Sequence, residues 1–384
     1  MAAGAVVVAV IRLLISLLLI CGAAAQAAIL PQDRADLMYH SYQGGGVSID
    51  GPAVMLRKKA GQSVSVSAYY YVDTVSGASV DVQATASAYS ETRQEKRLGV
   101  DYLAGNSILS ANYAQSDEDD YNAKSISFAI SHDTFGGMTT LSLEAGLGDD
   151  EVGRNGDDSF SESVKRYNYK LGWTQVLSSS WIAALNMQVD LDEGFLNNPY
   201  RSVRYRDVAD PRGYAYQREV YPDTRNAFAL SLVNKVYLPY RAALSVNLRH
   251  YQDSWDIRAL DAEVEYVHPL TQQWTLEGKL RWYSQGQADF YRDLFDFASQ
   301  QNFMARDKEL SEFNNLTLGI GASYALPVWG FWPEATPELT LQWDHIRFNY
   351  KNFRNVTVTD AEVGLEPLYR LDANVIRAFF SLYF

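Results

Sequence analysis

The chain ends in the stretch Ile376-Arg377-Ala378-Phe379-Phe380-Ser381-Leu382-Tyr383-Phe384, in which apolar and mixed positions alternate. Side chains along a β-strand point to opposite faces in turn, so one face of this strand is wholly apolar and the other is mixed. A soluble protein that exposed such a strand would risk edge-to-edge aggregation. In a bacterial outer-membrane barrel the same strand closes the sheet and ends in phenylalanine. We therefore assign Phe380, Leu382 and Phe384 to barrel closure and to an assembly signal.

The N-terminus indicates export. Residues 5–20 are nearly continuously apolar and are followed by small residues that end in Ala25-Gln26-Ala27. This pattern predicts a signal peptide over residues 1–27; a retained transmembrane anchor is the alternative, disfavoured because the apolar core is short for a helical span. Cleavage removes Cys21, the one cysteine, which excludes cysteine nucleophiles, CxxC redox motifs and iron–sulfur ligation. We expect no cofactor.

Composition narrows the class of protein. The formal net charge of −13 argues against nucleic acid as a partner, because phosphates require a basic surface. After the signal no apolar run is long enough for a membrane helix. Aromatic residues make up 13% of the chain and charged residues only 21%. This combination suits a transmembrane β-barrel with aromatic girdles, and a secreted β-sandwich or propeller is the alternative.

Short polar breaks recur along the chain, each flanked by alternating segments of about nine to eleven residues. Longer polar connections separate these hairpins, and short periplasmic turns with long extracellular loops are typical of outer-membrane barrels. We predict fourteen strands, with twelve or sixteen as alternatives, at residues 63–72, 95–103, 107–116, 123–133, 138–147, 165–177, 181–191, 224–238, 242–252, 257–268, 274–284, 314–325, 337–350 and 372–384. The predicted fold class is all-β: a single antiparallel transmembrane β-barrel.

Two boundaries follow from this strand count. Residues 28–60 are expected to form a periplasmic extension or a plug in the lumen, and residues 61–384 the barrel. The strand near 63–72 is then the one that pairs with the C-terminal strand to close the barrel. In the segment 337–350 the parity shifts between Trp343 and Ile346, which predicts a β-bulge there.

Opposite charges recur at inward-facing positions of neighbouring strands. Charged side chains toward lipid would be costly, so this face must be the lumen. We favour a salt-bridge ladder that fills the lumen, because inward charges need partners; the alternative is a charged constriction that filters solutes by sign. The predicted ladder consists of Arg249, Asp261, Glu263, Glu265, Glu277, Lys279, Arg281 and Arg377.

Three connections carry further signals. The acidic run at residues 117–120 lacks the spaced pattern of a calcium loop, so we interpret it as solvated. The connection at 194–225 is rich in Tyr and Arg, and loops of this length are functional or fold inward. Residues 288–313 carry phenylalanines at near-helical spacing, which predicts a short amphipathic helix that caps or plugs the mouth.

Catalysis is disfavoured. The five histidines form no Ser–His–Asp set on this topology and no pair at metal-ligand spacing. We therefore predict that the protein is not an enzyme, with no catalytic residues and no metal site.

Several stretches carry a family resemblance, among them Asp33-Arg34-Ala35-Asp36, Met38-Tyr39-His40, Gly148-Asp149-Asp150-Glu151-Val152, Ala288-Asp289-Phe290-Tyr291 and Glu366-Pro367-Leu368-Tyr369. They resemble DUF3570, an uncharacterised family of proteobacterial outer-membrane proteins. The family has no established activity, so the resemblance implies no catalytic residues. Its genes often neighbour those of a flavin transferase, a thioredoxin-like protein and a small lipoprotein, which implies a periplasmic redox or lipoprotein partner.

Two functions are consistent with the sequence. The first is a porin-like conduit for a small solute across the outer membrane of a Gram-negative bacterium. The second is a non-conducting scaffold that docks a periplasmic or surface partner. Either protein would contact outer-membrane lipid, lipopolysaccharide and the barrel-assembly machinery.

Overall fold

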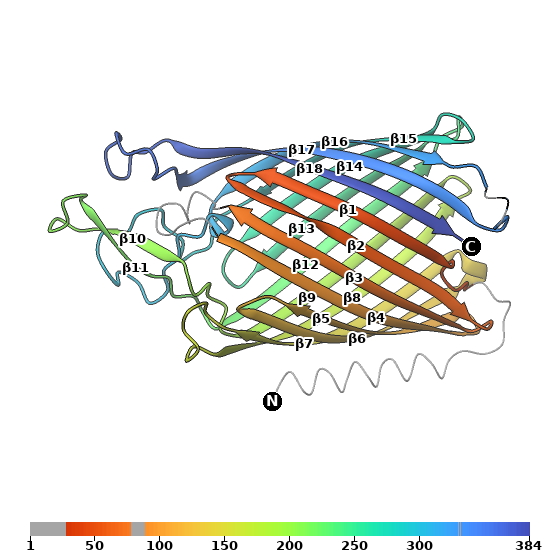
Figure 1. Ribbon diagram of the computed structural model, residues 1–384, viewed down its shortest axis with the longest axis horizontal. Helices are drawn as coiled ribbons and strands as arrows, with labels where there is room; N and C mark the ends of the chain where they lie inside the picture. Colours follow the sequence, from red (N-terminus) through yellow and green to blue (C-terminus); the bar gives the residue numbers. More distant parts are fainter. Residues whose placement is uncertain (1–27, 78–88, 329, 331) are drawn as a thin grey trace.

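Sixteen antiparallel strands close into a barrel in the described part of the computed structural model (Figure 1). The structure describes residues 28–77, 89–328, 330 and 332–384, so the expected signal peptide lies outside the described residues. The barrel strands are β1 (Arg34–Gly44), β2 (Val47–Ala60), β3 (Val64–Gly77), β4 (Tyr89–Ala104), β5 (Ser107–Asp117), β6 (Tyr121–Thr134), β7 (Thr139–Val152), β8 (Glu162–Ser178), β9 (Trp181–Gly194), β12 (Thr224–Tyr237), β13 (Ala243–Asp253), β14 (Arg258–Pro269), β15 (Trp274–Gln285), β16 (Phe313–Ala325), β17 (Thr336–Arg354) and β18 (Leu368–Tyr383). The predicted closed, antiparallel, all-β barrel is confirmed, with sixteen strands rather than fourteen.

Three short elements lie outside the barrel wall. A separate hairpin of β10 (Ser202–Arg206) and β11 (Tyr214–Arg218) stands between β9 and β12. Two 3-10 turns, η1 (Phe135–Gly137) and η2 (Lys308–Leu310), lie in connections. Among the described residues, no helix is long and apolar enough to cross a membrane.

Connections are sorted by length between the two ends of the barrel (Figure 1). The long connections 195–223, 286–312 and 355–367 share one end, here called the loop end, which also holds the tight turn at 45–46. The opposite end, here called the turn end, holds the start of β1, the end of β18 and short turns such as 105–106 and 179–180. The expected separation of long loops from short turns is therefore present.

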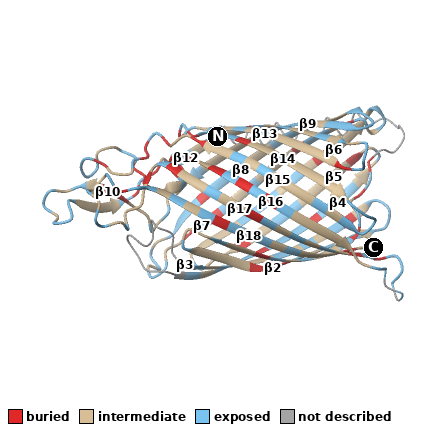
Figure 2. Cartoon of the chain, turned by 90° about the horizontal axis from the view of Figure 1, so that it is seen from above, coloured by how far each residue is buried: buried red, intermediate tan, exposed pale blue. Residues whose placement is uncertain are grey.

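The apolar outer surface of the barrel wall follows from the alternation of apolar and polar side chains along each strand. On β15 the outward Leu276, Leu280 and Trp282 are exposed, whereas the polar residues between them face inward. Apolar side chains left exposed along the outer surface are unfavourable in water and favourable in lipid. Exposed residues accordingly run along the outside of the strands, while buried ones include loop segments near β10 (Figure 2). Trp181 and Trp274 each begin a strand at the turn end, as an aromatic belt requires.

The C-terminal strand closes the barrel against β1, not against the strand near 63–72. Phe380 lies opposite Leu37 and Leu382 opposite Ala35, both on the outer face. The Phe384 N–H donates a hydrogen bond to the Asp33 carbonyl at 3.1 Å. These contacts place the three terminal apolar residues at the closure; their use as an assembly signal stays a prediction.

Residues 28–60 were expected to be an extension or plug, and this is wrong for residues 34–60, which form β1, β2 and the turn between them. The pattern that predicts a strand is interrupted in β2 by Gly51 and Pro52, and proline normally demotes a strand. The glycine is required by space, because a Cβ at Gly51 would lie 1.8 Å from the Val72 carbonyl oxygen. The barrel therefore begins at Arg34 instead of residue 61.

The β-bulge predicted between Trp343 and Ile346 is also misplaced. The register between β17 and β18 runs unbroken from Thr336 to Asn349 and shifts only between Asn349 and Arg354. Apolar residues appear on the inward face of β17 near the loop end because an apolar loop packs against them there. The change of pattern reflects a change of neighbour and not a change of strand register.

Candidate functional site

The predicted ladder residues all occupy inward positions in the register of β13–β18. Arg249 lies opposite Asp261, Glu263 opposite Arg281, and Glu265 opposite Lys279. Side-chain contacts join only part of this set: the Arg281 guanidinium contacts the Asp261 carboxylate, and Glu277 accepts a hydrogen bond from Gln342 Nε2 at 3.2 Å.

Asp344 completes the ladder and was missed by the sequence argument, which placed it at a bulge. Its two carboxylate oxygens contact Lys279 Nζ at 2.8 Å and the Arg377 guanidinium at 2.5 Å. The carboxylate thus links β15, β17 and β18 across Gly319 of β16, where a Cβ would lie 2.3 Å from Asp344 Oδ1. A parity count without the false bulge would have found it.

Four predicted ladder members have no ion pair within the described part of the chain, and one of them, Glu277, has only the hydrogen bond from Gln342. Arg249 lies beside the Tyr251 ring, 5.9 Å from its centroid, and Glu263 and Glu265 make no salt bridge there. Lys279 and Arg281 instead contact Asp344 and Asp261. The ladder is therefore continuous on β15–β18 and leaves charges of both signs facing the lumen on β13 and β14.

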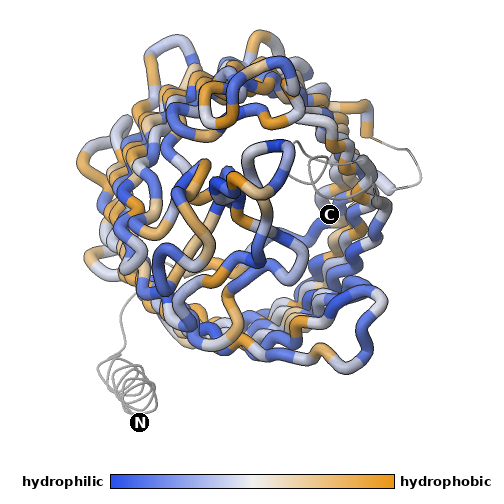
Figure 3. Tube along the Cα trace, turned by 90° about the vertical axis from the view of Figure 1, so that its left-hand side faces the viewer, coloured by the Kyte–Doolittle hydropathy of each residue, from blue (hydrophilic) through white to orange (hydrophobic). Residues whose placement is uncertain are grey.

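The three long connections form one unit at the loop end, here called the loop cap (residues 195–223, 286–312 and 355–367). Seen from the loop end, the chain crosses the barrel opening (Figure 3). Backbone pairing joins its parts, because Phe295 N–H donates to the Arg204 carbonyl at 2.9 Å and Met304 N–H to the Val220 carbonyl at 2.8 Å. The cap is thus a folded structure and not a set of independent loops.

An aromatic cluster fixes the cap to the inside of the wall. Inward residues of β15–β17 and of neighbouring strands pack against buried residues of the segment 286–312. Burial of aromatic side chains dominates such packing. The cluster comprises Tyr221, Trp255, Ile257, Ala288, Phe290, Tyr291, Ala305, Leu310, Phe313, Tyr350 and Phe353.

The amphipathic helix predicted over 288–313 is not present. Before β16 begins at Phe313, this segment holds the short turn η2 and takes part in three isolated bridges, Tyr205–Phe295, Val220–Met304 and Tyr291–Ala305. Its apolar residues do fold inward, as a plug would. The near-helical spacing was misleading because an irregular loop can bury residues without any period when it packs into a concave barrel mouth.

A buried ion network joins the three parts of the cap. The Arg204 side chain is only 1% exposed and contacts Glu366 Oε1 at 2.5 Å and Asp293 Oδ2 at 3.1 Å. Arg306 contacts the other Asp293 oxygen at 3.0 Å. Burial acts to raise the pKa of Glu366, but the hydrogen bonds and charge of Arg204, together with backbone N–H donors, outweigh it and lower that pKa below its usual value. Two guanidiniums therefore balance two carboxylates inside the cap.

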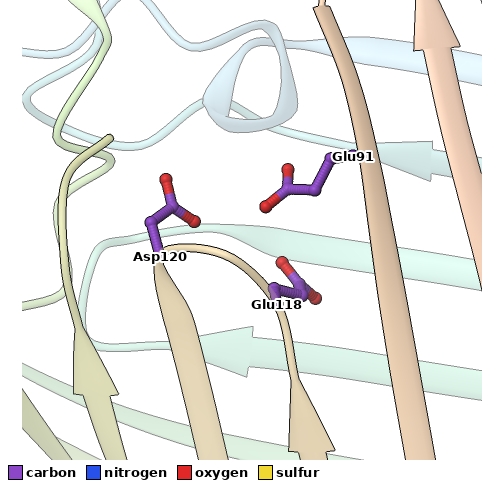
Figure 4. A group of neighbouring side chains, drawn as sticks. All are labelled: Glu91, Glu118 and Asp120. Carbon is purple, nitrogen blue, oxygen red and sulfur yellow. The ribbon is translucent and has the colours of Figure 1, made fainter. Parts of the chain in front are cut away.

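Three carboxylates gather where β4 and β5 meet the cap (Figure 4). Oxygen atoms of Glu91, Glu118 and Asp120 lie within 4.8 Å of one another, a ligand type that divalent cations prefer. Arg93 Nε lies 3.6 Å from Glu118, and the Tyr200 hydroxyl donates to Asp120. Burial raises the pKa of Glu118, which Arg93 opposes and Asp120 reinforces. The chain itself thus supplies partners for two of the three carboxylates.

Two of the cavities inside the barrel lie under the cap and along the inward face of β1–β7. The mouth cavity, of about 790 Å³, lies under the cap. The lumen cavity, of about 880 Å³, extends along the inward face of β1–β7 and β18. At three places the members of the two cavities lie only two residues apart: Glu91 and Arg93 on β4, Ser116 on β5 and Glu118 just after it, and Tyr121 and Ala123 on β6. Such residues are separated by about 7 Å along a strand, so the two cavities adjoin.

The site residues of β1–β4 were not predicted: β1 and β2 were not expected in the wall, and the predicted ladder included no residue of β3 or β4. His40 of β1 is one of them: its Nε2 lies 2.6 Å from Asp73 Oδ1, and its ring stacks on Tyr71 at 5.0 Å. Arg93, Glu95 and Arg97 alternate in charge along one face of β4, which is the signal that the sequence offered. The predicted ladder lay on other strands and did not include these residues.

The family comparison agrees with the sequence motifs. Residues 161–330 match the DUF3570 family model, described as a protein of unknown function. This match confirms the resemblance. The DUF3570 region covers β8 to β16 and most of the loop cap, including Arg204, Asp293 and Arg306. No curated protein matches the chain.

Solved structures resemble the barrel. A bacterial polysaccharide outer membrane secretin aligns with a TM-score of 0.50 and 9% identity, over 92% of this chain and 100% of that one. The outer membrane protein opdK from Pseudomonas aeruginosa aligns with a TM-score of 0.43 and 10% identity, over 93% and 100%. The first likeness supports the fold of an outer-membrane barrel and nothing finer.

We predict that cap stability depends on pH through Glu219. Burial raises its pKa to about 7, Asp307 adds to the rise, and the Tyr221 hydroxyl and Arg306 N–H oppose it. An exposed glutamate has a pKa of about 4.3. At pH values between about 4.3 and about 7, Glu219 keeps its proton in the closed cap and releases it in the open cap. Opening therefore becomes easier by roughly 3 kcal/mol as pH rises from about 4.3 to about 7, with no further change above.

Hydrogen exchange at Arg306, whose N–H donates to Glu219 Oε1 at 2.6 Å, measures this opening once intrinsic exchange rates at each pH are removed. Glu219→Gln should flatten the profile. Glu309→Gln, at an exposed glutamate in the same segment as Arg306, should leave the pH dependence of exchange unchanged. A profile that Glu219→Gln does not change would contradict the assignment.

Proposed function

We propose that the protein is an outer-membrane channel that conducts a small solute along one side of its lumen. The observation that carries the proposal is the pair of adjoining cavities, about 790 and 880 Å³, beside β4–β6. Together they lead from the cap at the loop end toward Arg34 and Ser381 at the turn end. Small solutes pass through pores whose lining groups bind them weakly and repeatedly.

The opposite side of the lumen is closed. There Asp344 holds Lys279 and Arg377 together, and the aromatic cluster occupies the mouth. Ion pairs with several partners and close-packed aromatic side chains resist displacement by water. We therefore infer that a path through this barrel runs off-centre, along the wall formed by β18 and β1–β7.

A cysteine test decides between the two sides. No cysteine follows Cys21, so single cysteines can be placed without interference. We expect Ser125→Cys, at an exposed lumen-cavity position on β6, to let a bulky thiol reagent reduce single-channel conductance in planar bilayers by half or more. Thr317→Cys, at a buried inward position on β16, should give no block. A wild-type protein without conductance, or equal block at both sites, would refute the path.

A scaffold is the second candidate, and the separate β10–β11 hairpin, which projects beyond the barrel, supports it (Figure 1). Residues 34–60 lie in β1, β2 and their turn, so we place docking of a partner at the loop end instead. Cross-linking on cells should then recover one dominant partner that is lost when residues 207–213 are replaced by a Gly-Ser turn. Recovery that is unchanged by this replacement would argue against docking at the hairpin.

A further inference from the structure

The lumen cavity presents positive charge. On β4, Arg93 and Arg97 both contact Glu95, with Arg93 Nη2 at 2.9 Å from Glu95 Oε2. The Arg97 side chain is 59% exposed and the Arg93 side chain 41%, whereas that of Glu95 is 8% exposed. At the turn end, too, the Arg34 side chain is more exposed than the Asp36 side chain that it contacts. All of these residues line the cavity, and in each pair the guanidinium is more exposed than the carboxylate.

Apolar side chains gather beside these guanidiniums, which is unusual in a polar lumen. Met38 of β1 lies in register with Phe379 of β18, and Met55 of β2 with Tyr69 of β3. All four line the cavity. The Arg97 guanidinium lies 5.3 Å from the centroid of the Tyr69 ring, so the aromatic surface leads directly to the exposed cation.

We propose that the lumen cavity binds small organic anions, with a carboxylate on Arg97 and Arg93 and an apolar body on Met38, Met55 and Phe379. A guanidinium fork suits a planar carboxylate, and soft methionine side chains accommodate varied apolar shapes. The remaining carboxylate of the lining, Glu144, is held by Lys170 at 3.2 Å. This inference deepens the proposed function and rests on it, because binding serves transport only if the cavity lies on a conducting path.

The approach to the site is one-sided. Glu91, Glu118 and Asp120 stand between the lumen cavity and the mouth cavity. Like charge there repels an anion arriving from the loop end, whereas Arg34 attracts one arriving from the turn end. An anion added at the turn end therefore reaches the site more readily than one added at the loop end.

Benzoate is the probe, with benzylammonium as a cation of similar size. We expect calorimetry on the purified barrel to show benzoate binding and no benzylammonium binding. Arg97→Gln should weaken benzoate binding about tenfold, since a charge-assisted hydrogen bond is lost. Arg281→Gln is the matched control: it removes the same charge from an inward ion pair on the opposite wall and should leave binding unchanged.

A second variant covers the case in which Arg97→Gln does not fold. Ser125→Asp adds a carboxylate on the same inward face, in register with Ala114 and through it with Arg97, and should weaken benzoate binding to a similar extent. In planar bilayers benzoate should reduce the current more from the turn end than from the loop end. Equal loss in Arg97→Gln and Arg281→Gln, or no benzoate binding by a conducting wild type, overturns the inference. Benzoate binding by a non-conducting wild type would uphold the site and overturn the channel.

Discussion

Replacing Arg204 with methionine is expected to destabilise the closed loop cap by about 3–5 kcal/mol. The guanidinium holds Glu366 from the segment 355–367 and Asp293 from the segment 286–312, and it comes itself from β10. Without Arg204, the buried Glu366 carboxylate has no cation in contact with its oxygens among the described residues. It keeps the hydrogen bond that the Gly364 N–H donates at 2.9 Å. Leaving a buried charge unpaired costs far more than an intact buried pair contributes.

Arg212 provides the matched control. Its guanidinium lies 5.2 Å from the Tyr214 ring centroid, as that of Arg204 does, and it also pairs with a carboxylate, that of Asp210. It is exposed, however, so Arg212→Met should leave cap stability almost unchanged because water solvates the remaining carboxylate. The two variants remove the same group from the same connection and differ in burial.

Hydrogen exchange at the Phe295 and Met304 amides measures this effect, since both amides donate across the cap. Protection should fall strongly in Arg204→Met and hardly at all in Arg212→Met. Adding Glu366→Gln to Arg204→Met should recover part of the loss, because it removes the uncompensated charge. If protection in Arg204→Met matched that of the wild type, the ion network would not be needed to keep the cap closed, and the aromatic cluster alone would do so.

The wall could be predicted from sequence because each strand carries its own evidence. In β15 the alternation of Leu276, Leu280 and Trp282 with charged residues depends only on neighbours two positions away. All fourteen predicted segments coincide with strands. The pair β1 and β2 was missed because Gly51 and Pro52 interrupt the strand pattern of β2, and Gly51 is required there because the Val72 carbonyl leaves no room for a side chain.

The cap and the cavities could not be predicted, because they depend on contacts between distant residues. Arg204 and Glu366 are 162 positions apart, and neither neighbourhood in sequence indicates the other. Inward aromatic residues of β17 resembled a change of register because their neighbours, the residues of the segment 286–312, were unknown. The ladder was assigned to the correct face, but side-chain partners such as Asp344 required the fold.

Replacing Ile320 with arginine is expected to destabilise the barrel by about 2–4 kcal/mol when it is refolded into lipid vesicles and titrated with urea. Ile320 lies near the middle of β16, faces outward and is 64% exposed, between Gly278 of β15 and Trp343 of β17. In a bilayer this position meets hydrocarbon, where a guanidinium loses its hydration without a partner. The measurement compares the unfolding midpoints of variant and wild type at equal slope.

An inward arginine separates this effect from a general cost of mutation. Ser127→Arg adds the same side chain to the lumen cavity on β6, where water and polar groups remain available, and should change stability much less. The contrast bears on where the protein resides. If the outer surface faced water, as in a secreted barrel, arginine at the exposed Ile320 would shift stability by no more than about 0.5 kcal/mol. A large loss at Ile320 together with a small one at Ser127 would therefore require hydrocarbon around the barrel, whereas two small losses would contradict an outer-membrane location.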